Sequence, residues 1–146
     1  MRLDDVLEIL KALPLFRGVD AEALRLLGFS AIRRQLRPGD ILFRRGDPSE
    51  GAFLVLSGEI VLDRQDDGAP SPFVFGPGTL IGQTALFALI ERPATAIARD
   101  ATSLLLFTRD LMFKVLDAHP RAAQQVQAAL AAQLKETMER ANRVAL

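Results

Sequence analysis

The sequence predicts a mainly β protein with helices at both ends. Between about residues 29 and 108, short apolar runs alternate with turn residues roughly every 8–12 positions, which is typical of a β-sandwich or barrel. The segments 1–28 and 109–146 instead carry the spacing of amphipathic helices. We therefore predict one domain over residues 1–146, with a β-rich zone enclosed by helical zones.

Composition excludes several classes of protein. The chain has 146 residues and no cysteine, which excludes a disulfide framework, a zinc–thiolate site and a cysteine nucleophile. It has a single histidine, His119, which argues against a multi-histidine metal enzyme. Basic and acidic residues balance at 18 each, and no apolar run approaches the roughly 20 residues of a membrane span. We expect a cytoplasmic protein that is no enzyme, holds no metal or cofactor, and binds neither membranes nor nucleic acid.

The N-terminal zone is predicted to contain two short helices. The apolar residues of the first recur at i, i+3, i+4 and i+7, at Leu3, Val6, Leu7 and Leu10. The Leu13-Pro14 pair should end this helix, because proline cannot continue it. Asp20 is a suitable N-cap for a second helix that turns Leu24 and Leu27 inward.

The middle zone should consist of strands with one helical interruption. The predicted strands are 41–43, 53–56, 60–62, 73–75, 94–98 and 104–107. Turns are expected at Arg37–Asp40 and Gly46–Pro48, and a hairpin tip at Asp66–Gly68. The pairs Arg33-Arg34 and Arg44-Arg45 are interpreted as solvated strand faces, since acidic neighbours offset them. The segment 82–90 is instead compatible with a helix.

The C-terminal zone is predicted to form two helices. The first covers 109–116 and ends near His119-Pro120, where His119 is interpreted as a helix-boundary residue. The second is alanine-rich and about 35 Å long at ~1.5 Å per residue. Its apolar stripe consists of Val126, Leu130, Leu134 and Met138. A small β-domain cannot cover a helix of this length, so we expect a homodimer in which part of the stripe meets a second chain.

One segment of the middle zone has the pattern of a phosphate site. A short helix that opens after Gly82 would present unpaired backbone N–H groups to an anion. Ten residues later, Arg92 offers a planar guanidinium that can bind a phosphate through two parallel hydrogen bonds. The two features together predict a small phosphate pocket within the β-rich zone.

These residues resemble the cyclic nucleotide-binding domain family. The framework Gly46-Asp47-x₅-Phe53-x-Val55-x₂-Gly58 is similar to that of its early strands. The run 78–86, followed by 92–95, is similar to its phosphate-binding cassette. The resemblance implies an eight-stranded β-roll of the jelly-roll type, with N-terminal helices, a cassette helix within 78–95 and two C-terminal helices.

The resemblance also implies roles for individual residues. Gly82 would let the backbone approach the ligand, the Ala85 N–H would bond a phosphate oxygen, and Arg92 would pair with the cyclic phosphate. Gln83 replaces the family's usual glutamate on the ribose 2′-hydroxyl, and Pro93 lacks the N–H that often reaches the phosphate. The implied ligand-binding residues are Gly82, Gln83, Thr84, Ala85, Arg92, Pro93, Ala94 and Thr95.

Two functions of different classes follow from the sequence. The first is a sensor of cyclic AMP or cyclic GMP, with cyclic AMP favoured, whose C-terminal helix relays binding and supplies Lys135 or Thr137 as a lid. The output would be a further part of a longer chain, dimerisation or a separate protein. The second is a dimerisation module that has lost its ligand through Gln83 and Pro93. A third hypothesis, intermediate between these two, is a pocket that accepts a different anion. No helix-turn-helix follows the last helix, so we expect no direct DNA binding.

Overall fold

The computed structural model describes residues 2–63 and 73–145 and divides the chain into two compact units. The first unit joins residues 1–29 to residues 114–146, and the second consists of residues 30–113. The hairpin tip expected at Asp66–Gly68 lies outside the described residues. The two units are described in turn.

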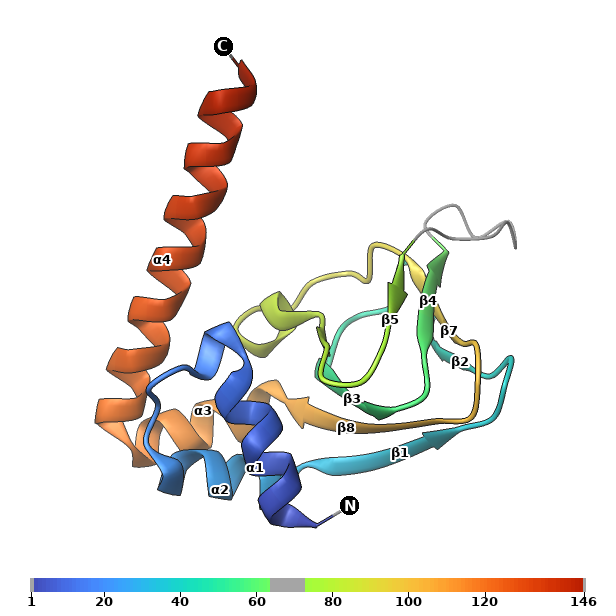
Figure 1. Ribbon diagram of the computed structural model, residues 1–146, viewed down its shortest axis with the longest axis horizontal. Coiled ribbons are helices and arrows are strands. Elements are labelled where there is room, and N and C mark those ends of the chain that lie inside the picture. Colours follow the sequence, from blue (N-terminus) through green and yellow to red (C-terminus); the bar gives the residue numbers. More distant parts are fainter. Residues whose placement is uncertain (1, 64–72, 146) are drawn as a thin grey trace. The chain divides into compact units, whose positions relative to one another are not determined.

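The unit of residues 30–113 is the predicted β-roll (Figure 1). Its strands form two four-stranded antiparallel sheets, in the orders β1-β8-β3-β6 and β2-β7-β4-β5. The strands are β1 (Ile32–Leu36), β2 (Ile41–Phe43), β3 (Gly51–Ser57), β4 (Ile60–Asp63), β5 (Val74–Phe75), β6 (Leu80–Ile81), β7 (Thr95–Ala98) and β8 (Thr102–Thr108). This arrangement confirms the mainly β, eight-stranded fold.

The core of the β-roll forms from both sheets. Its buried members are Phe53, Val55, Ile60, Ile81, Ala96, Ala98, Leu104 and Leu106. Strand β3 is buried over all but its last residue, which explains why its sequence is a continuous apolar run instead of an alternating one. It pairs with β8 from Gly51–Thr108 onward, so these two strands form the centre of their sheet.

The two turns on either side of β2 have the same hydrogen-bond pattern. In Arg37–Asp40 and in Arg44–Asp47, the arginine N–H donates to the aspartate carboxylate, at 2.8 and 2.9 Å, and the aspartate N–H returns a bond to the arginine carbonyl. The third residue of each is a glycine with φ near +88° or +87°, a conformation that other residues adopt at a cost. The first glycine N–H donates to the Ala98 carbonyl, and the second to the Arg92 carbonyl.

Strand β2 contains a bulge between these two turns. Ile41 pairs with Ile97, but Phe43 pairs with Ala96, so β2 has one more residue than its partner over this stretch. As a result, both Leu42 and Phe43 pack against the core, although they are consecutive in sequence.

The unit of residues 1–29 and 114–146 is helical. Helix α1 (Leu3–Ala12) ends at the predicted Leu13-Pro14 break, and a single 3₁₀ turn, η1 (Pro14–Phe16), follows. Helix α2 (Ala21–Ser30) begins directly after Asp20, whose carboxylate accepts a hydrogen bond from the Glu22 N–H at 3.2 Å. The predicted inward residues are buried at Val6, Leu7, Leu10, Leu24 and Leu27.

The C-terminal helices follow the predicted boundary. Helix α3 (Arg109–Ala118) continues directly from β8, and α4 (Pro120–Ala145) begins one residue after it ends, with proline at the first helical position. Along α4 the predicted stripe is buried at Val126 but 62% exposed at Leu134 and 58% exposed at Met138. In the described part of the chain, no helix is long and apolar enough to cross a lipid bilayer.

Candidate functional site

Gly82 and Arg92 lie against each other in the β-roll. Gly82 has φ +81°, in the left-handed region that favours glycine. A β-carbon at this position would lie 2.6 Å from Arg92 Nη1, so the guanidinium would have to shift to admit a side chain. The backbone conformation therefore favours glycine here, and the missing side chain lets the guanidinium lie against the main chain. The structure thus brings together the two residues that the sequence analysis linked by their ten-residue separation.

The Arg92 side chain is buried against two neighbouring aromatic rings. It is 4% exposed, and its Cζ lies 4.3 Å from the centre of the Phe43 ring and 5.6 Å from that of Phe53. Its Nη2 donates a hydrogen bond to the Gly51 carbonyl at 2.7 Å. Among the described residues no carboxylate lies within ion-pair distance of this guanidinium. The charge is thus held by ring faces and one carbonyl.

The electrostatic setting of Arg92 disfavours its charge. Burial lowers the pKa of the guanidinium, the Glu50 carboxylate raises it, the positive charge of Arg109 lowers it, and Asp47 raises it. A buried cation with these surroundings has lost its hydration without gaining a neutralising contact. An anion that bound there would remove part of this penalty, because it would supply the opposite charge next to a buried cation.

The main chain fixes Arg92 from both sides. Its N–H donates to the Asp47 carbonyl at 2.8 Å, and its own carbonyl accepts from the Gly46 N–H at 2.8 Å. The turn Arg44–Asp47 therefore holds the backbone from which the guanidinium projects. The positive φ of Gly46 allows its N–H to point at this carbonyl.

The cassette helix is shorter than the sequence predicted. The expected helix over 82–90 is one 3₁₀ turn, η2 (Gln83–Leu86), with Gly82 as N-cap. The Ala85 N–H donates to the Gly82 carbonyl at 2.9 Å, so it is engaged within the turn. A phosphate oxygen at Ala85 would share or replace this bond.

Arg109 explains where the cassette helix ends. Its Nη1 donates to the carbonyls of Ala85 at 2.9 Å, Ala88 at 3.1 Å and Ser49 at 3.2 Å, and its Nη2 donates to Ser49 again at 2.9 Å. A carbonyl bound to this guanidinium need not be satisfied by a further helical turn. Arg109 is the first residue of α3, so this side chain connects η2, the segment before β3 and the start of a helix.

The sequence of the β-roll and the helix after it match a known family. Residues 33–119 match the cyclic nucleotide-binding domain. The chain belongs to this family. The matched range includes Gly82, Arg92 and Arg109, so the site described above lies within the part of the chain that carries the family's signature.

Two relatives illustrate the range of proteins that carry this domain. The chain is 34% identical over 130 residues to the cyclic AMP receptor protein of Thermus thermophilus, covering 87% of this chain and 60% of that protein. It is 32% identical over 114 residues to a lysophospholipase nte1 of Neurospora crassa, covering 77% of this chain but 8% of that enzyme. The chain thus spans less than two thirds of either relative.

A solved structure supports the same assignment. The N-terminal domain of a transcriptional regulator from Streptomyces coelicolor A3(2) is 32% identical, with a TM-score of 0.83 over 90% of this chain and 93% of that one. The lysophospholipase match is confined to a small part of a large enzyme, so it concerns the cyclic nucleotide-binding domain and carries no implication of catalysis.

The remaining predicted site residues surround this pair in different ways. Gln83 is half-buried and Thr84 is exposed, both on η2. Pro93 is exposed next to Arg92, whereas Ala94 is buried. Thr95 is also buried, and its hydroxyl accepts a hydrogen bond from the Arg45 N–H at 2.9 Å, which gives it a structural partner.

The predicted lid candidates are placed on α4. Lys135 and Thr137 are both exposed, and the Thr137 hydroxyl donates to the Gln133 carbonyl at 3.0 Å within the helix.

Sequence reasoning missed Arg109 and Ser49. A signal for Arg109 does exist, because a cation at the first position of a helix opposes the helix dipole and needs another source of stabilisation. The three carbonyls that supply it come from residues 49, 85 and 88, and no residue pattern marks a carbonyl as an acceptor.

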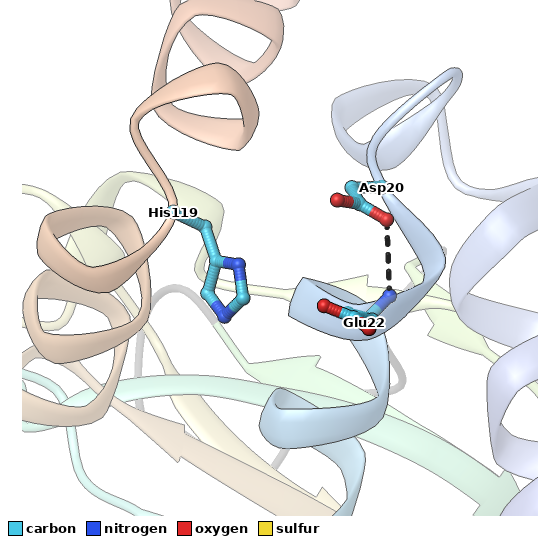
Figure 2. A group of neighbouring side chains, drawn as sticks. All are labelled: Asp20, Glu22 and His119. Atoms are coloured by element: carbon cyan, nitrogen blue, oxygen red, sulfur yellow. Dashed lines mark hydrogen bonds between the residues drawn. The ribbon is translucent and has the colours of Figure 1, made fainter.

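One group of side chains in the helical unit has the composition of a metal site. Ligand atoms of Asp20, Glu22 and His119 lie within 4.8 Å of one another. Figure 2 shows the three neighbouring side chains. Asp20 is the cap of α2, and its own N–H donates to the Gln125 side chain at 3.2 Å. His119 stands at the boundary between α3 and α4, as predicted, with its N–H donating to the Val115 carbonyl. Capping of α2 accounts for the position of Asp20, and the boundary between α3 and α4 accounts for that of His119.

Proposed function

We propose that this chain is a cyclic AMP sensor whose ligand phosphate binds Arg92 beside Gly82. The observation that carries the proposal is the buried guanidinium, which has two ring faces and one carbonyl as partners and no carboxylate among the described residues. A cyclic phosphate is a monoanion with two free oxygens, and a guanidinium can bind both through parallel hydrogen bonds. Because Gly82 has no side chain, none stands between the main chain and this guanidinium.

Membership of the cyclic nucleotide-binding domain family supports the ligand class, and the name of the T. thermophilus relative favours cyclic AMP. We place the ribose near Gln83 and the phosphate near Ala85 and the 92–95 segment. We further propose that binding is relayed through the C-terminal helices to a separate output protein in the cytoplasm, without catalysis and without direct contact to nucleic acid or membrane.

The test of the ligand is a thermal-shift titration of the purified chain with cyclic AMP, cyclic GMP and AMP. Ligand at about 100 times its Kd should stabilise the fold by ~2.7 kcal/mol, because it binds the folded state alone. For a chain of this length this corresponds to an increase in Tm of about 5–10 °C. We expect the largest increase with cyclic AMP and none with AMP.

Arg92→Met is the variant that ties the shift to the proposed site. Methionine keeps the length and apolar stem of the side chain but cannot bind phosphate, so the increase in Tm should disappear. Arg37→Met is the matched control, since the Arg37 side chain is 90% exposed and remote in function from the cassette. If Arg92→Met keeps the increase, the phosphate does not bind at Arg92.

A second candidate function is a dimerisation module without a ligand. Two observations favour it, the engaged N–H of Ala85 and the missing N–H of Pro93, which together remove two phosphate donors. Absence of any thermal shift with millimolar cyclic AMP, cyclic GMP or AMP would favour this function over the sensor.

Both functions include a homodimer through α4. Leu134 and Met138 are largely exposed on its apolar stripe, and burial of such residues against a second copy would be favourable. We expect sedimentation equilibrium to give a dimer for the natural chain and a monomer for the double variant Leu134→Glu, Met138→Glu. The variant Lys135→Glu, Glu136→Lys is the control, because it reverses exposed charges without touching the stripe. A natural chain that sediments as a monomer would contradict the proposal.

A further inference from the structure

Arg109 connects the cassette to the start of a helix by a single side chain. Its guanidinium binds the carbonyls of Ala85 and Ala88 in the cassette and that of Ser49 before β3. A guanidinium is a planar fork, so its bonds to several carbonyls fix their relative positions more firmly than a flexible ammonium would.

The backbone around Arg109 is held independently of this side chain. The Arg109 N–H donates to the Glu50 carbonyl at 2.9 Å, and the Leu111 N–H donates to the Thr108 hydroxyl at 3.1 Å, which caps the first turn of α3. The start of α3 is therefore anchored by one main-chain bond to the residue before β3 and by one bond to the Thr108 hydroxyl at the end of β8. The side chain of Arg109 adds the connection from this anchored turn to the cassette.

Carbonyls just before and at the start of β3 accept hydrogen bonds from both Arg92 and Arg109. Arg109 binds the Ser49 carbonyl, while Arg92 binds the Gly51 carbonyl two residues later. Ser49 also exchanges two hydrogen bonds with Ile90, one through its N–H and one through its hydroxyl. An anion at Arg92 would thus act on a segment whose other contacts lead to Arg109.

We propose that Arg109 is a positioning residue that transmits occupancy of the Arg92 site to the first turn of α3 through the carbonyls of Ala85, Ala88 and Ser49. This inference rests on the proposed function, since it presumes that a cyclic nucleotide binds at Arg92. When the ligand shifts the cassette, the four hydrogen bonds oblige the Arg109 side chain to follow. A residue that only stabilised the fold would not link the two movements.

The experiment uses a fluorophore at the start of α3. The chain has no tryptophan and no tyrosine, and Phe113 is 50% exposed in the first turns of that helix. A Phe113→Trp parent therefore carries a single tryptophan whose emission reports on its surroundings. Cyclic AMP affinity is measured in the same samples by isothermal titration calorimetry, and emission is read at saturating ligand.

We expect the parent to bind cyclic AMP with a change in emission. With Arg109→Met added, binding should persist within about tenfold while most of the emission change is lost, because the side chain that couples the cassette to the start of α3 is gone. Arg109→Lys should restore part of the change, since an ammonium can still donate to some of the carbonyls. Arg99→Met is the matched control, as Arg99 is an exposed arginine of the same unit, and it should leave the change intact.

Two results would overturn the inference, and they differ from each other. A parent that binds no cyclic AMP contradicts the proposed function, and the inference falls with it. A parent that binds, together with an Arg109→Met or Arg109→Lys variant that keeps the full emission change, contradicts the inference alone. If Arg109→Met does not fold, Arg109→Lys decides, because full retention of the change in that variant alongside an unaltered Arg99→Met control shows that the guanidinium fork is not needed.

Discussion

Arg92 and Arg109 belong to the same compact unit, but their guanidinium groups differ in how many hydrogen bonds they make to the protein. Arg92 is buried, has one carbonyl partner and is otherwise enclosed by the rings of Phe43 and Phe53. Arg109 is half-buried and makes four hydrogen bonds to three carbonyls. The first guanidinium retains donors for an external anion, and the second has committed them to the fold. The comparison separates binding from positioning among residues of one type.

The largest expected effect is on stability and tests the difference directly. Arg109→Met should lower the free energy of unfolding by about 3 kcal/mol, because it leaves the carbonyls of Ser49, Ala85 and Ala88 without their donor. Arg92→Met should change it by less than about 1 kcal/mol, since the lost bond to Gly51 is offset by removal of a buried charge. Urea unfolding without ligand measures both. Equal losses would end the distinction between the two residues.

A second prediction concerns the space that Arg92 occupies. Gly82→Ala should destabilise the fold by about 2 kcal/mol, from backbone strain at φ +81° and from collision with Arg92 Nη1. Gly39→Ala is the control, because Gly39 has φ +88° with no atom within 4 Å of a β-carbon, so it should lose only the strain, about 1 kcal/mol. Urea unfolding gives both values. Identical losses would mean that the guanidinium moves aside without cost.

A third prediction sharpens the role of the cassette beside Arg92. Gln83→Glu should raise the affinity for cyclic AMP about fivefold, because a charged acceptor binds the ribose hydroxyl more strongly than an amide does. Calorimetric titration with 2′-deoxy cyclic AMP is the control, since that ligand has no 2′-hydroxyl and should gain nothing. An equal gain for both ligands would place the ribose away from residue 83.

The smallest expected effect is at the residue after Arg92. Pro93→Ala restores a backbone N–H at an exposed position, and one added hydrogen bond to phosphate should raise cyclic AMP affinity about threefold. Pro38→Ala serves as the control for loss of a proline in a turn of the same unit. Unchanged affinity in Pro93→Ala by calorimetry would show that the phosphate is held by Arg92 without its neighbour.

The sequence allowed prediction of much of the fold because its local signals agree with the final packing. Strand β2 was predicted over the same residues, 41–43, since turns with glycine bound it on both sides. Helix α4 was predicted from its alanine-rich composition and its apolar stripe. In contrast, β1 and β6 were not predicted individually, because Ile32–Leu36 is mostly polar and exposed and Leu80–Ile81 is only two residues long.

The site was predictable where it depends on side-chain identity and spacing. Arg92 was found through its distance in sequence from Gly82, and the structure brings the two into contact. The length of η2 and the role of Arg109 were not predictable, because both depend on main-chain carbonyls that any residue would supply. The ring of Phe43 below Arg92 was equally hidden, since it depends on the register of β2.

The bulge in β2 determines which of its side chains face the core. In a regular strand Leu42 and Phe43 would face opposite sides, and only one of them could reach the core. The extra residue resets this alternation, so Phe43 turns inward and its ring comes within 4.3 Å of the Arg92 Cζ. A deletion of one residue from β2 would leave the composition of the site intact but present Phe43 to solvent. The contact of the Arg92 guanidinium with the Phe43 ring thus depends on one extra residue in β2.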